Sequence, residues 1–210
     1  MEVFTLPVGQ LTTNCYLLAD PATEAAIIVD PGDDAQFIIQ KVLDERLKVE
    51  AILATHGHFD HVLAVNELKL AFNVPFLMHG KDQFLLDRLR QTTKHFTGFD
   101  PGPAPKVDQI LDRELRFEVG AIQLDIIKTP GHTPGSVSYY QPQSHQLWVG
   151  DVVFAGGAVG STEHTYSSAA DLDTSIKTLF ALPDQTMIYA GHGESFYLEE
   201  EKRYHQPRNL

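Results

Sequence analysis

Three histidines and one aspartate fall within six consecutive positions of this 210-residue chain. They belong to the segment Thr55-His56-Gly57-His58-Phe59-Asp60-His61. In an extended backbone the side chains of His56 and His58 point the same way, while those of Asp60 and His61 diverge. Imidazole and carboxylate donors without thiolate favour zinc, iron or manganese over a cysteine-rich structural zinc site. The segment therefore predicts a metal centre, with a solvated histidine-rich loop as the alternative.

Three further donors follow strand-like segments or sit in glycine-rich turns. His132 lies in the proline- and glycine-rich stretch 129–136, which fixes a tight loop. Asp151 follows the apolar stretch 147–149, and His192 stands between two glycines after another strand-like segment. Each one alone is more often a turn residue or a hydrogen-bonding loop group. Because ligands in α/β proteins bind at the edge where strands end, we expect the three to meet the first cluster.

The elements that must position these residues are strands alternating with helices. Predicted strands, rich in β-branched and aromatic residues, are 15–18, 26–29, 51–54, 76–78, 122–127, 136–140, 147–149 and 187–189. Helical patterns cover 35–45, 61–72, 81–90 and 170–182, with Asp33 or Asp34 as the expected cap of the first and Asp60 at the start of the second. The strands cluster at both ends of the sequence, which predicts a mixed α/β (α+β) fold with two β-rich halves.

The length fits one domain spanning 1–210 with a hydrophobic core of its own. The stretch 92–108 is predicted to be a long loop, because it contains several glycines and prolines that disfavour regular structure. They are Gly98, Pro101, Gly102, Pro103 and Pro105. Long loops of this kind are usually functional. We therefore predict a lid at 92–108, with a linker between domains as the alternative.

Composition excludes several function classes. Hydrophobic residues make up 43% and charged residues 21% of the chain, which is typical of a globular protein. A net charge of −12 argues against binding to nucleic acid or to an anionic membrane, since both need a basic surface. Cys15 is the single cysteine, so no intrachain disulfide can form. With a start that lacks the pattern of a signal peptide, these features predict a soluble protein of the cytoplasm.

Taken together, the motifs resemble those of the metallo-β-lactamase superfamily. The resemblance is carried by Thr13-Asn14-Cys15-Tyr16, Asp30-Pro31-Gly32, Thr55–His61, Pro130–Ser136, Gly150-Asp151 and Gly191-His192-Gly193. Within the superfamily the chain looks most like the short bacterial relatives of glyoxalase II, the hydroxyacylglutathione hydrolases. The resemblance implies a four-layer αββα sandwich with metal ions at one edge.

The resemblance also implies which residues hold the ions. His56, His58 and His132 would hold one ion, Asp60, His61 and His192 the other, and Asp151 would bridge both. The two divalent ions are expected to be zinc, with iron or manganese as alternatives. Asp60 is in addition the predicted catalytic side chain. Asp30, Thr55 and Thr133 are predicted to hold ligands in place through hydrogen bonds, although Asp30 before proline fits a turn equally well.

This ligand count suits hydrolysis. Three nitrogens and one shared oxygen leave an open position for water, which a closed structural site lacks. The predicted reaction is attack of a metal-bridging hydroxide on a thioester such as an S-acylglutathione, because a thiolate leaves with little need for protonation. Three alternatives stay open. They are a mononuclear-iron persulfide dioxygenase using His56, His132 and Asp151, a hydrolase of lactones or β-lactams, and a metal-binding protein without catalysis.

The substrate is expected to be a small molecule, with a glutathione conjugate as one candidate. Predicted contacts are Ser161, His164 and Tyr166 after the bridging aspartate, and Lys94 and Phe96 in the predicted lid. The resemblance is weaker here. The family's loop usually carries Arg or Lys where this chain has Ser161-Thr162, and full-length glyoxalase II has a helical C-terminal region with basic groups, whereas 18 residues follow His192 here. Lys94 or Arg203 is expected to substitute.

Overall fold

The computed structural model describes residues 1–113 and 116–205, which form two six-stranded sheets. The first sheet contains, in spatial order, β1 (Glu2–Val8), β2 (Thr13–Ala19), β3 (Ala25–Val29), β4 (Lys48–Leu53), β5 (Phe76–Met78) and β6 (Gln109–Ile110). The second contains β12 (Phe196–Tyr197), β11 (Met187–Ala190), β10 (Gln146–Gly150), β9 (Val137–Gln141), β8 (Ile122–Lys128) and β7 (Arg116–Val119). Both sheets mix parallel and antiparallel pairs.

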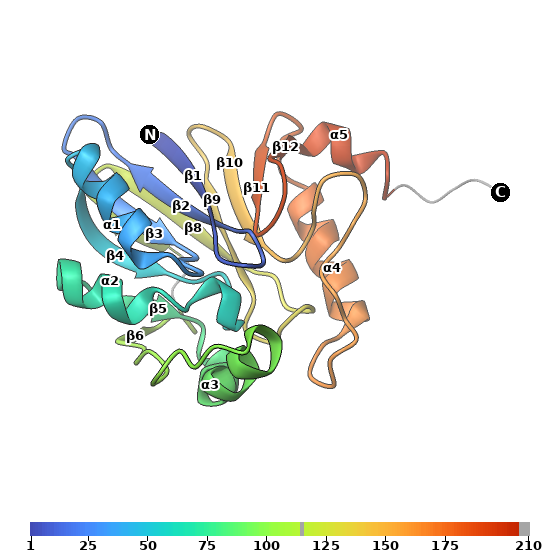
Figure 1. Ribbon diagram of the computed structural model, residues 1–210. Coiled ribbons are helices and arrows are strands. Elements are labelled where there is room, and N and C mark those ends of the chain that lie inside the picture. The colour runs from blue at the N-terminus through green and yellow to red at the C-terminus, as the bar shows by residue number, and fades with distance from the viewer. Residues whose placement is uncertain (114–115, 206–210) are drawn as a thin grey trace.

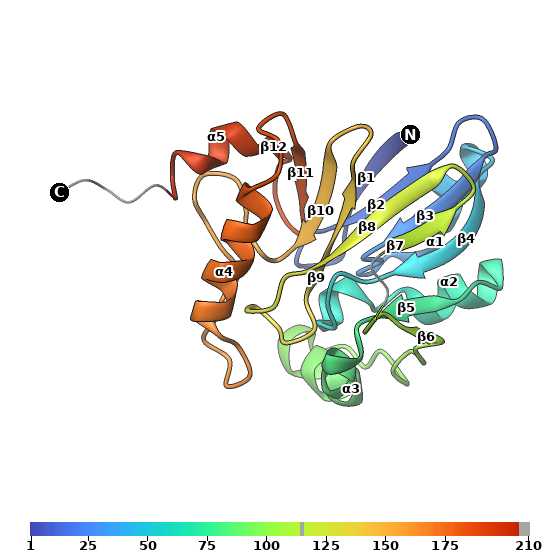
Figure 2. The same ribbon diagram turned by 180° about the vertical axis from the view of Figure 1, so that it is seen from behind.

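Helices cover the outer faces of both sheets (Figures 1 and 2). They are α1 (Ala35–Asp44), α2 (Val65–Phe72), α3 (Gln83–Thr97), α4 (Ala169–Phe180) and α5 (Leu198–Lys202), with short 3-10 turns at Phe59–His61 and Gly80–Asp82. Figure 1 shows α1 and α2 beside the first sheet and α4 and α5 beside the second. The predicted four-layer αββα sandwich is confirmed.

Three apolar clusters lie between these layers. Ile38 of α1 and Leu68 of α2 pack on Leu17 of the first sheet. Leu18, the next residue of β2, belongs instead to the cluster between the two sheets, which also contains Trp148. Successive side chains of a strand point to opposite faces, so a strand buried on both faces has an unbroken run of apolar residues. The third cluster joins the second sheet to α4.

The eight predicted strands all correspond to strands of the structure, whereas β1, β6, β7 and β12 were not predicted. The predicted helix 61–72 begins late, since Phe59–His61 forms a 3-10 turn and α2 starts at Val65. Asp34 is the N-cap residue of α1, as predicted, but it adopts a left-handed φ of 51° and its side chain makes no capping hydrogen bond. Its carboxylate accepts the backbone N–H of Gly9 instead, at 2.9 Å.

The predicted loop 92–108 is wrong in its first part, because α3 continues to Thr97. Leu85, Leu86, Leu89 and Thr93 are buried along one side of this helix, so burial of that face outweighs the loop-like composition that follows. The helix ends at Gly98, whose φ of 73° lies in the left-handed region that glycine adopts readily. A lid function for the remaining residues stays a prediction, as does the single domain. Within the described residues, no helix combines the length and apolar character of a membrane span.

The two sheets meet at one edge, and the loops that carry the candidate ligands come together there. The backbone N–H of Asn14 donates to the carbonyl of Gly191 at 2.8 Å, and that of Val137 donates to the carbonyl of Thr55 at 2.8 Å. Each of these bonds joins a residue of the first sheet or its loops to one of the second. The loop after β4 is thereby held beside the start of β9, and the loop after β11 beside the start of β2.

Candidate metal centre

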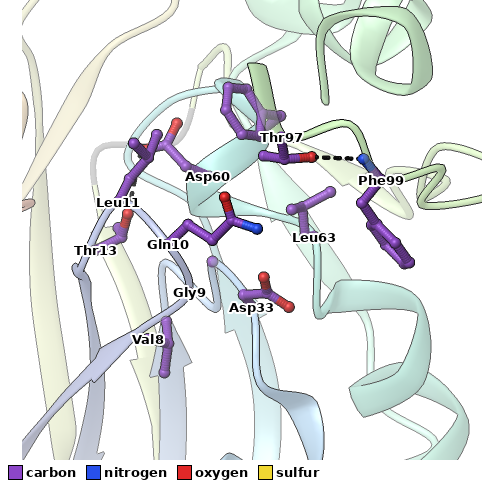
Figure 3. A pocket seen from close by; sticks show the side chains of 12 residues that line it. Val8, Gly9, Gln10, Leu11, Thr13, Asp33, Asp60, Leu63, Thr97 and Phe99 are labelled. Atoms are coloured by element: carbon purple, nitrogen blue, oxygen red, sulfur yellow. Dashed lines mark hydrogen bonds between the residues drawn. The ribbon is translucent and has the colours of Figure 1, made fainter. Parts of the chain in front are cut away.

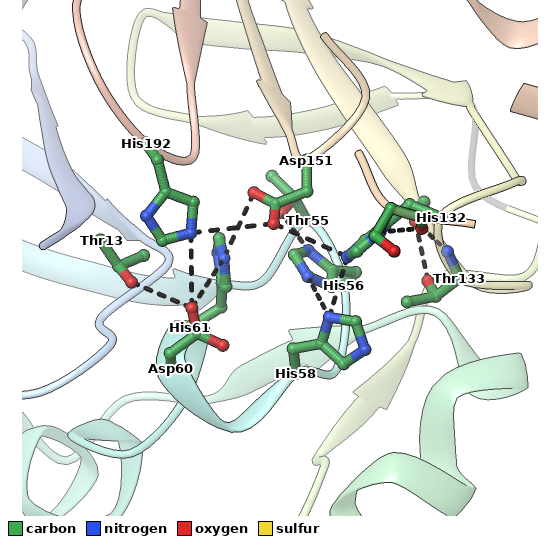
Figure 4. Close-up of polar contacts among 12 residues, drawn as sticks. Thr13, Thr55, His56, His58, Asp60, His61, His132, Thr133, Asp151 and His192 are labelled. Atoms are coloured by element: carbon green, nitrogen blue, oxygen red, sulfur yellow. Dashed lines mark hydrogen bonds and ion pairs between the residues drawn. The ribbon is translucent and has the colours of Figure 1, made fainter. Parts of the chain in front are cut away.

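The seven predicted ligands converge at this edge (Figure 4). Side-chain donor atoms lie within 4.8 Å of one another in three groups, which are His56–His58–His132, His56–His61–Asp151 and Asp60–His61–His192. The first group is tight: Nδ1 of His58 lies 3.0 Å from Nε2 of His56 and 2.9 Å from Nε2 of His132. Donors separated by some 80 positions in the sequence thus share one small volume.

The second half of the cluster is organised around two carboxylates. Oδ2 of Asp60 lies 3.6 Å from Nε2 of His61 and 3.4 Å from Nε2 of His192. Asp151 stands between the two halves. Its oxygens lie 3.4 Å from Nε2 of His61, 3.6 Å from Nε2 of His132 and 3.7 Å from Nε2 of His192.

Each histidine has one ring nitrogen held by an acceptor outside the cluster, which leaves the other nitrogen turned inward. Nδ1 of His132 donates to the carbonyl of Ser161 at 2.8 Å, and Nδ1 of His192 donates to the carbonyl of Leu11 at 3.1 Å. His58 is turned the other way, with Nε2 bonded to the hydroxyl of Tyr166 at 2.8 Å. Such outer hydrogen bonds fix the tautomer and direction of metal-binding imidazoles.

Asp30 and Thr55 hold the remaining two rings. Oδ2 of Asp30 accepts from Nδ1 of His61 at 3.1 Å and from the hydroxyl of Thr55 at 2.7 Å. Because the Thr55 proton is used in that bond, its oxygen can only accept from Nδ1 of His56, 3.1 Å away. Both rings therefore present Nε2 to the cluster. The structure thus places Asp30 and Thr55 where the sequence predicted supporting contacts.

Thr133 lies elsewhere, and its position reveals a residue that the sequence analysis missed. Its hydroxyl donates to Oδ2 of Asp82 at 2.7 Å, rather than to any of the seven side chains. The buried Asp82 carboxylate also accepts the backbone N–H groups of Gly57 at 2.9 Å and Gly135 at 2.7 Å. Asp82 thus joins the loop of His56 and His58 to the loop of His132. The one signal in the sequence is an acid shortly after the predicted strand 76–78.

The electrostatics of the cluster favour neutral imidazoles at His56 and His58 beside ionised carboxylates at Asp60 and Asp151. Burial and the neighbouring rings lower the pKa of His56, and they lower that of His58 to about 3. Burial opposes ionisation of Asp60 and Asp151, yet the histidines around them outweigh it and the pKa of each lies below its usual value. His61 behaves differently. Burial lowers its pKa, but the carboxylates of Asp151, Asp60 and Asp30 raise it by more, so the net shift is upward. These carboxylates favour a positive charge at His61.

Two buried atoms test whether a metal ion fits. Nε2 of His61 and Oδ1 of Asp151 are buried, face one another at 3.4 Å, and have no hydrogen-bond partner among the residues that the structure describes. Buried polar atoms without partners are costly, and a native structure normally satisfies them. A cation that accepts one lone pair from each would satisfy both. The donor set of imidazole and carboxylate suits zinc, iron or manganese.

Four of the predicted substrate residues line a cavity beside His58 or the groove next to it. Phe96, His164 and Tyr166 line a cavity of about 240 Å³ beside His58. Lys94 lines an open groove that continues from this cavity along α3. Ser161 contributes through its backbone, since its carbonyl accepts from His132, and its hydroxyl accepts the N–H of Glu163 at 3.3 Å. Arg203 bonds the carbonyl of Glu200 in the C-terminal segment.

Comparisons with known proteins agree with this geometry. The family model described as metallo-beta-lactamase superfamily matches residues 8–192. The chain is 36% identical over 211 residues to the hydroxyacylglutathione hydrolase GloC of Haemophilus influenzae, covering 97% of this chain and 96% of that protein.

Two solved structures are also similar to this chain. The BLEG-1 B3 metallo-beta-lactamase matches with a TM-score of 0.90 and 33% identity, covering 96% of this chain and 97% of the other. TTHA1623 in a di-iron-bound form matches with a TM-score of 0.85 and 30% identity, covering 96% and 98%. With seven potential ligands gathered at one sheet edge, the chain belongs to the metallo-beta-lactamase superfamily and is one of its metal-dependent hydrolases.

Proposed function

We propose that the chain is a binuclear metallohydrolase of thioesters, with the seven clustered side chains as ligands. His56, His58 and His132 would hold one divalent ion, Asp60, His61 and His192 would hold the other, and Asp151 would contribute to both sites. The observation that carries the proposal is the orientation of the five imidazoles. Each has one nitrogen engaged by an acceptor outside the cluster and the other directed at the other side chains of the cluster.

Ions bound there supply Lewis acidity, which activates water and polarises a substrate carbonyl. The side chains of the protein orient the water and accept its proton. Oδ2 of Asp60 accepts a hydrogen bond from the hydroxyl of Thr13 at 3.2 Å. This bond fixes the Asp60 oxygen while the side chain remains part of the cluster. Asp60 is therefore the carboxylate that we propose to orient the attacking water and accept its proton. Thr13 sets the direction of that carboxylate.

A thioester fits this apparatus for a chemical reason. The leaving thiolate has a conjugate acid with a pKa near ~8.5, so it departs at neutral pH without a dedicated acid. The similarity to a hydroxyacylglutathione hydrolase adds support and makes S-acylglutathiones the first substrates to test. Zinc is the proposed metal, and the di-iron form of a similar protein makes iron the alternative.

The decisive experiment compares one preparation in three states: as purified and metal-loaded, exhaustively chelated, and reloaded with zinc, iron or manganese. Hydrolysis of S-lactoylglutathione is followed by thiol release. The proposal requires turnover when loaded, loss on chelation and recovery on reloading. Asp151→Asn, which removes the bridging charge, is expected to lower kcat by a factor on the order of 100 or more. Turnover that survives chelation contradicts the proposal.

A second candidate is hydrolysis of β-lactams, favoured by the similarity to a B3 metallo-beta-lactamase. The same metal centre can attack an amide carbonyl, but a leaving amine needs a proton that a thiolate does not. A chromogenic β-lactam in the same assay separates the two substrate classes by kcat/KM. Oxygen consumption with glutathione persulfide and a single bound iron would instead indicate the dioxygenase alternative.

A further inference from the structure

Two cavities lie beside the ligand cluster, one lined by Asp60 and the other by His58. One, of about 270 Å³, lies between the turn joining β1 to β2 and the end of α3, beside Asp60 (Figure 3). The other is the cavity of about 240 Å³ beside His58. Phe59 lines both, and its ring stacks on Phe96 with centroids 5.8 Å apart. A substrate that is cleaved at the cluster can therefore place one half in each cavity.

The two cavities differ in charge. The cavity beside Asp60 also contains the carboxylate of Asp33, and none of its lining residues is basic. The cavity beside His58 has the opposite character. Its lining includes the guanidinium of Arg88 and no carboxylate. An anionic group is repelled from the first cavity and attracted to the second.

Arg88 is free to pair with a ligand. Within residues 1–113 and 116–205, no carboxylate lies within ion-pair distance of it, in a chain whose net charge is −12. Arg90, two positions further along the same helix, is by contrast bonded to both carboxylate oxygens of Asp100, at 2.7 and 2.8 Å. The Arg88 guanidinium lies 6.0 Å from the ring centre of Phe84, which packs edge-on against Tyr166 at 5.1 Å. The guanidinium thus lies near the ring of Phe84, which in turn contacts Tyr166, and both Arg88 and Tyr166 line the cavity.

Tyr166 adds a neutral donor to the same cavity. Its hydroxyl oxygen accepts from Nε2 of His58, so its own proton remains available to a ligand. The cavity opens into a groove of about 720 Å³ along α3, which shares Arg88 and Phe96 with it and adds Lys94. A ligand longer than the cavity can extend there past a second cation. This surface suits an extended group that carries carboxylates.

We propose that the cavity between α3 and Tyr166 binds the thiol half of the substrate, that this half carries a carboxylate, and that Arg88 pairs with it. The acyl half then occupies the cavity beside Asp33 and Thr13. The inference rests on the proposed thioester hydrolysis and specifies its substrate class: small neutral acyl groups on an acidic thiol such as a peptide thiol. Arg88 would also provide the positive charge that the family's loop usually supplies at the position of Ser161.

The test compares two thioesters of the same acyl group, S-lactoylglutathione and the neutral S-lactoyl-N-acetylcysteamine. Arg88→Gln is expected to raise KM for the anionic thioester about tenfold relative to the neutral one, the effect of one charge-assisted hydrogen bond. Arg88→Lys restores part of the preference, since it keeps the charge but not the planar fork. The control is Arg90→Gln, which makes the same change on the same helix outside the cavity. Equal changes of KM for both thioesters, or none for either, overturn the inference.

Binding of S-methylglutathione, which cannot be hydrolysed, separates this inference from the proposed function. Calorimetry on the metal-loaded protein is expected to show binding that Arg88→Gln weakens about tenfold and Arg90→Gln does not weaken. If the wild type binds S-methylglutathione in this way but hydrolyses no thioester, the proposed function fails and the anionic subsite stands. If it hydrolyses thioesters but Arg88→Gln binds as tightly as the wild type, the subsite fails alone.

Discussion

Oδ2 of Asp30 lies 3.1 Å from Nδ1 of His61, and this contact ties the end of β3 to the ligand cluster. The same carboxylate accepts the backbone N–H and the hydroxyl of Thr55, each at 2.7 Å. To reach both, Asp30 adopts a φ of 52°, a left-handed conformation that few residues other than glycine adopt. The bonds of the carboxylate to Thr55 and His61 hold the backbone in this conformation, which suggests the hypothesis that Asp30 positions His61.

Replacing Asp30 tests that role. In Asp30→Asn the side chain keeps its size but loses the charge that orients His61. We expect the affinity for the second metal ion to fall roughly 10- to 100-fold, the usual effect of losing such an outer contact. Competition with a chelator measures it. The control is Asp44→Asn at the exposed end of α1, which is expected to keep the affinity of the wild type. Unchanged affinity in Asp30→Asn would show that the carboxylate only forms a turn.

Asp82 is predicted to matter for stability. Asp82→Ala leaves two buried backbone donors without an acceptor, namely the N–H groups of Gly57 and Gly135, while the hydroxyl of Thr133 can still bond to that of Ser136. Each unsatisfied buried donor costs about 1–3 kcal/mol, so the free energy of unfolding should fall by at least about 2 kcal/mol. Urea denaturation of metal-free protein measures the loss. Asp87→Ala on the exposed side of α3 serves as the control, and a loss no larger than that of the control contradicts the prediction.

Tyr166→Phe removes one hydroxyl and keeps the ring that stacks on His164, with centroids 5.0 Å apart. His58 then lacks the acceptor of its Nε2–H. We expect the affinity for the first ion to fall about tenfold. The measurement is metal binding without substrate, so the result does not depend on turnover. Tyr204→Phe, which changes an exposed tyrosine, controls for the substitution. An affinity equal to that of the wild type means that Tyr166 does not orient His58.

Metal removal is predicted to destabilise the chain. Asp60 and Asp151 lie near Nε2 of His61 and Asp30 bonds to its Nδ1, so cations bound in the cluster would balance this concentration of negative charge. A ligand that binds the folded state alone, at a free concentration of 1,000 times its Kd, stabilises that state by about 4 kcal/mol. Thermal unfolding with excess zinc should therefore show a Tm several degrees above that of chelated protein. An identical Tm in both conditions argues against a metal centre.

The sequence could predict which side chains gather at the sheet edge, for a physical reason. Metal-binding residues must be of particular types, and His56, His132 and Asp151 each follow a strand whose apolar pattern is plain. The supporting residues were harder to predict. Asp82 has no distinctive neighbours, and only the folded chain shows that it accepts donors from two loops.

The same contrast holds for the helices and the substrate cavities. The buried face of α3 continues through Thr93. The glycines and prolines that follow made this part of the sequence look like a loop. Lys94 was predicted as the cation for substrate, but Arg88 is the one that lines the cavity beside His58. Which side of an exposed helix faces a cavity depends on tertiary packing, and the sequence does not reveal it.

The most direct test of the binuclear centre is anomalous diffraction from crystals of the metal-loaded protein, recorded at the absorption edge of the metal. The proposed ligand sets predict two peaks per chain, one among His56, His58 and His132 and one among Asp60, His61 and His192, with Asp151 between them. A single peak at full loading, or peaks remote from Asp151, would contradict the account.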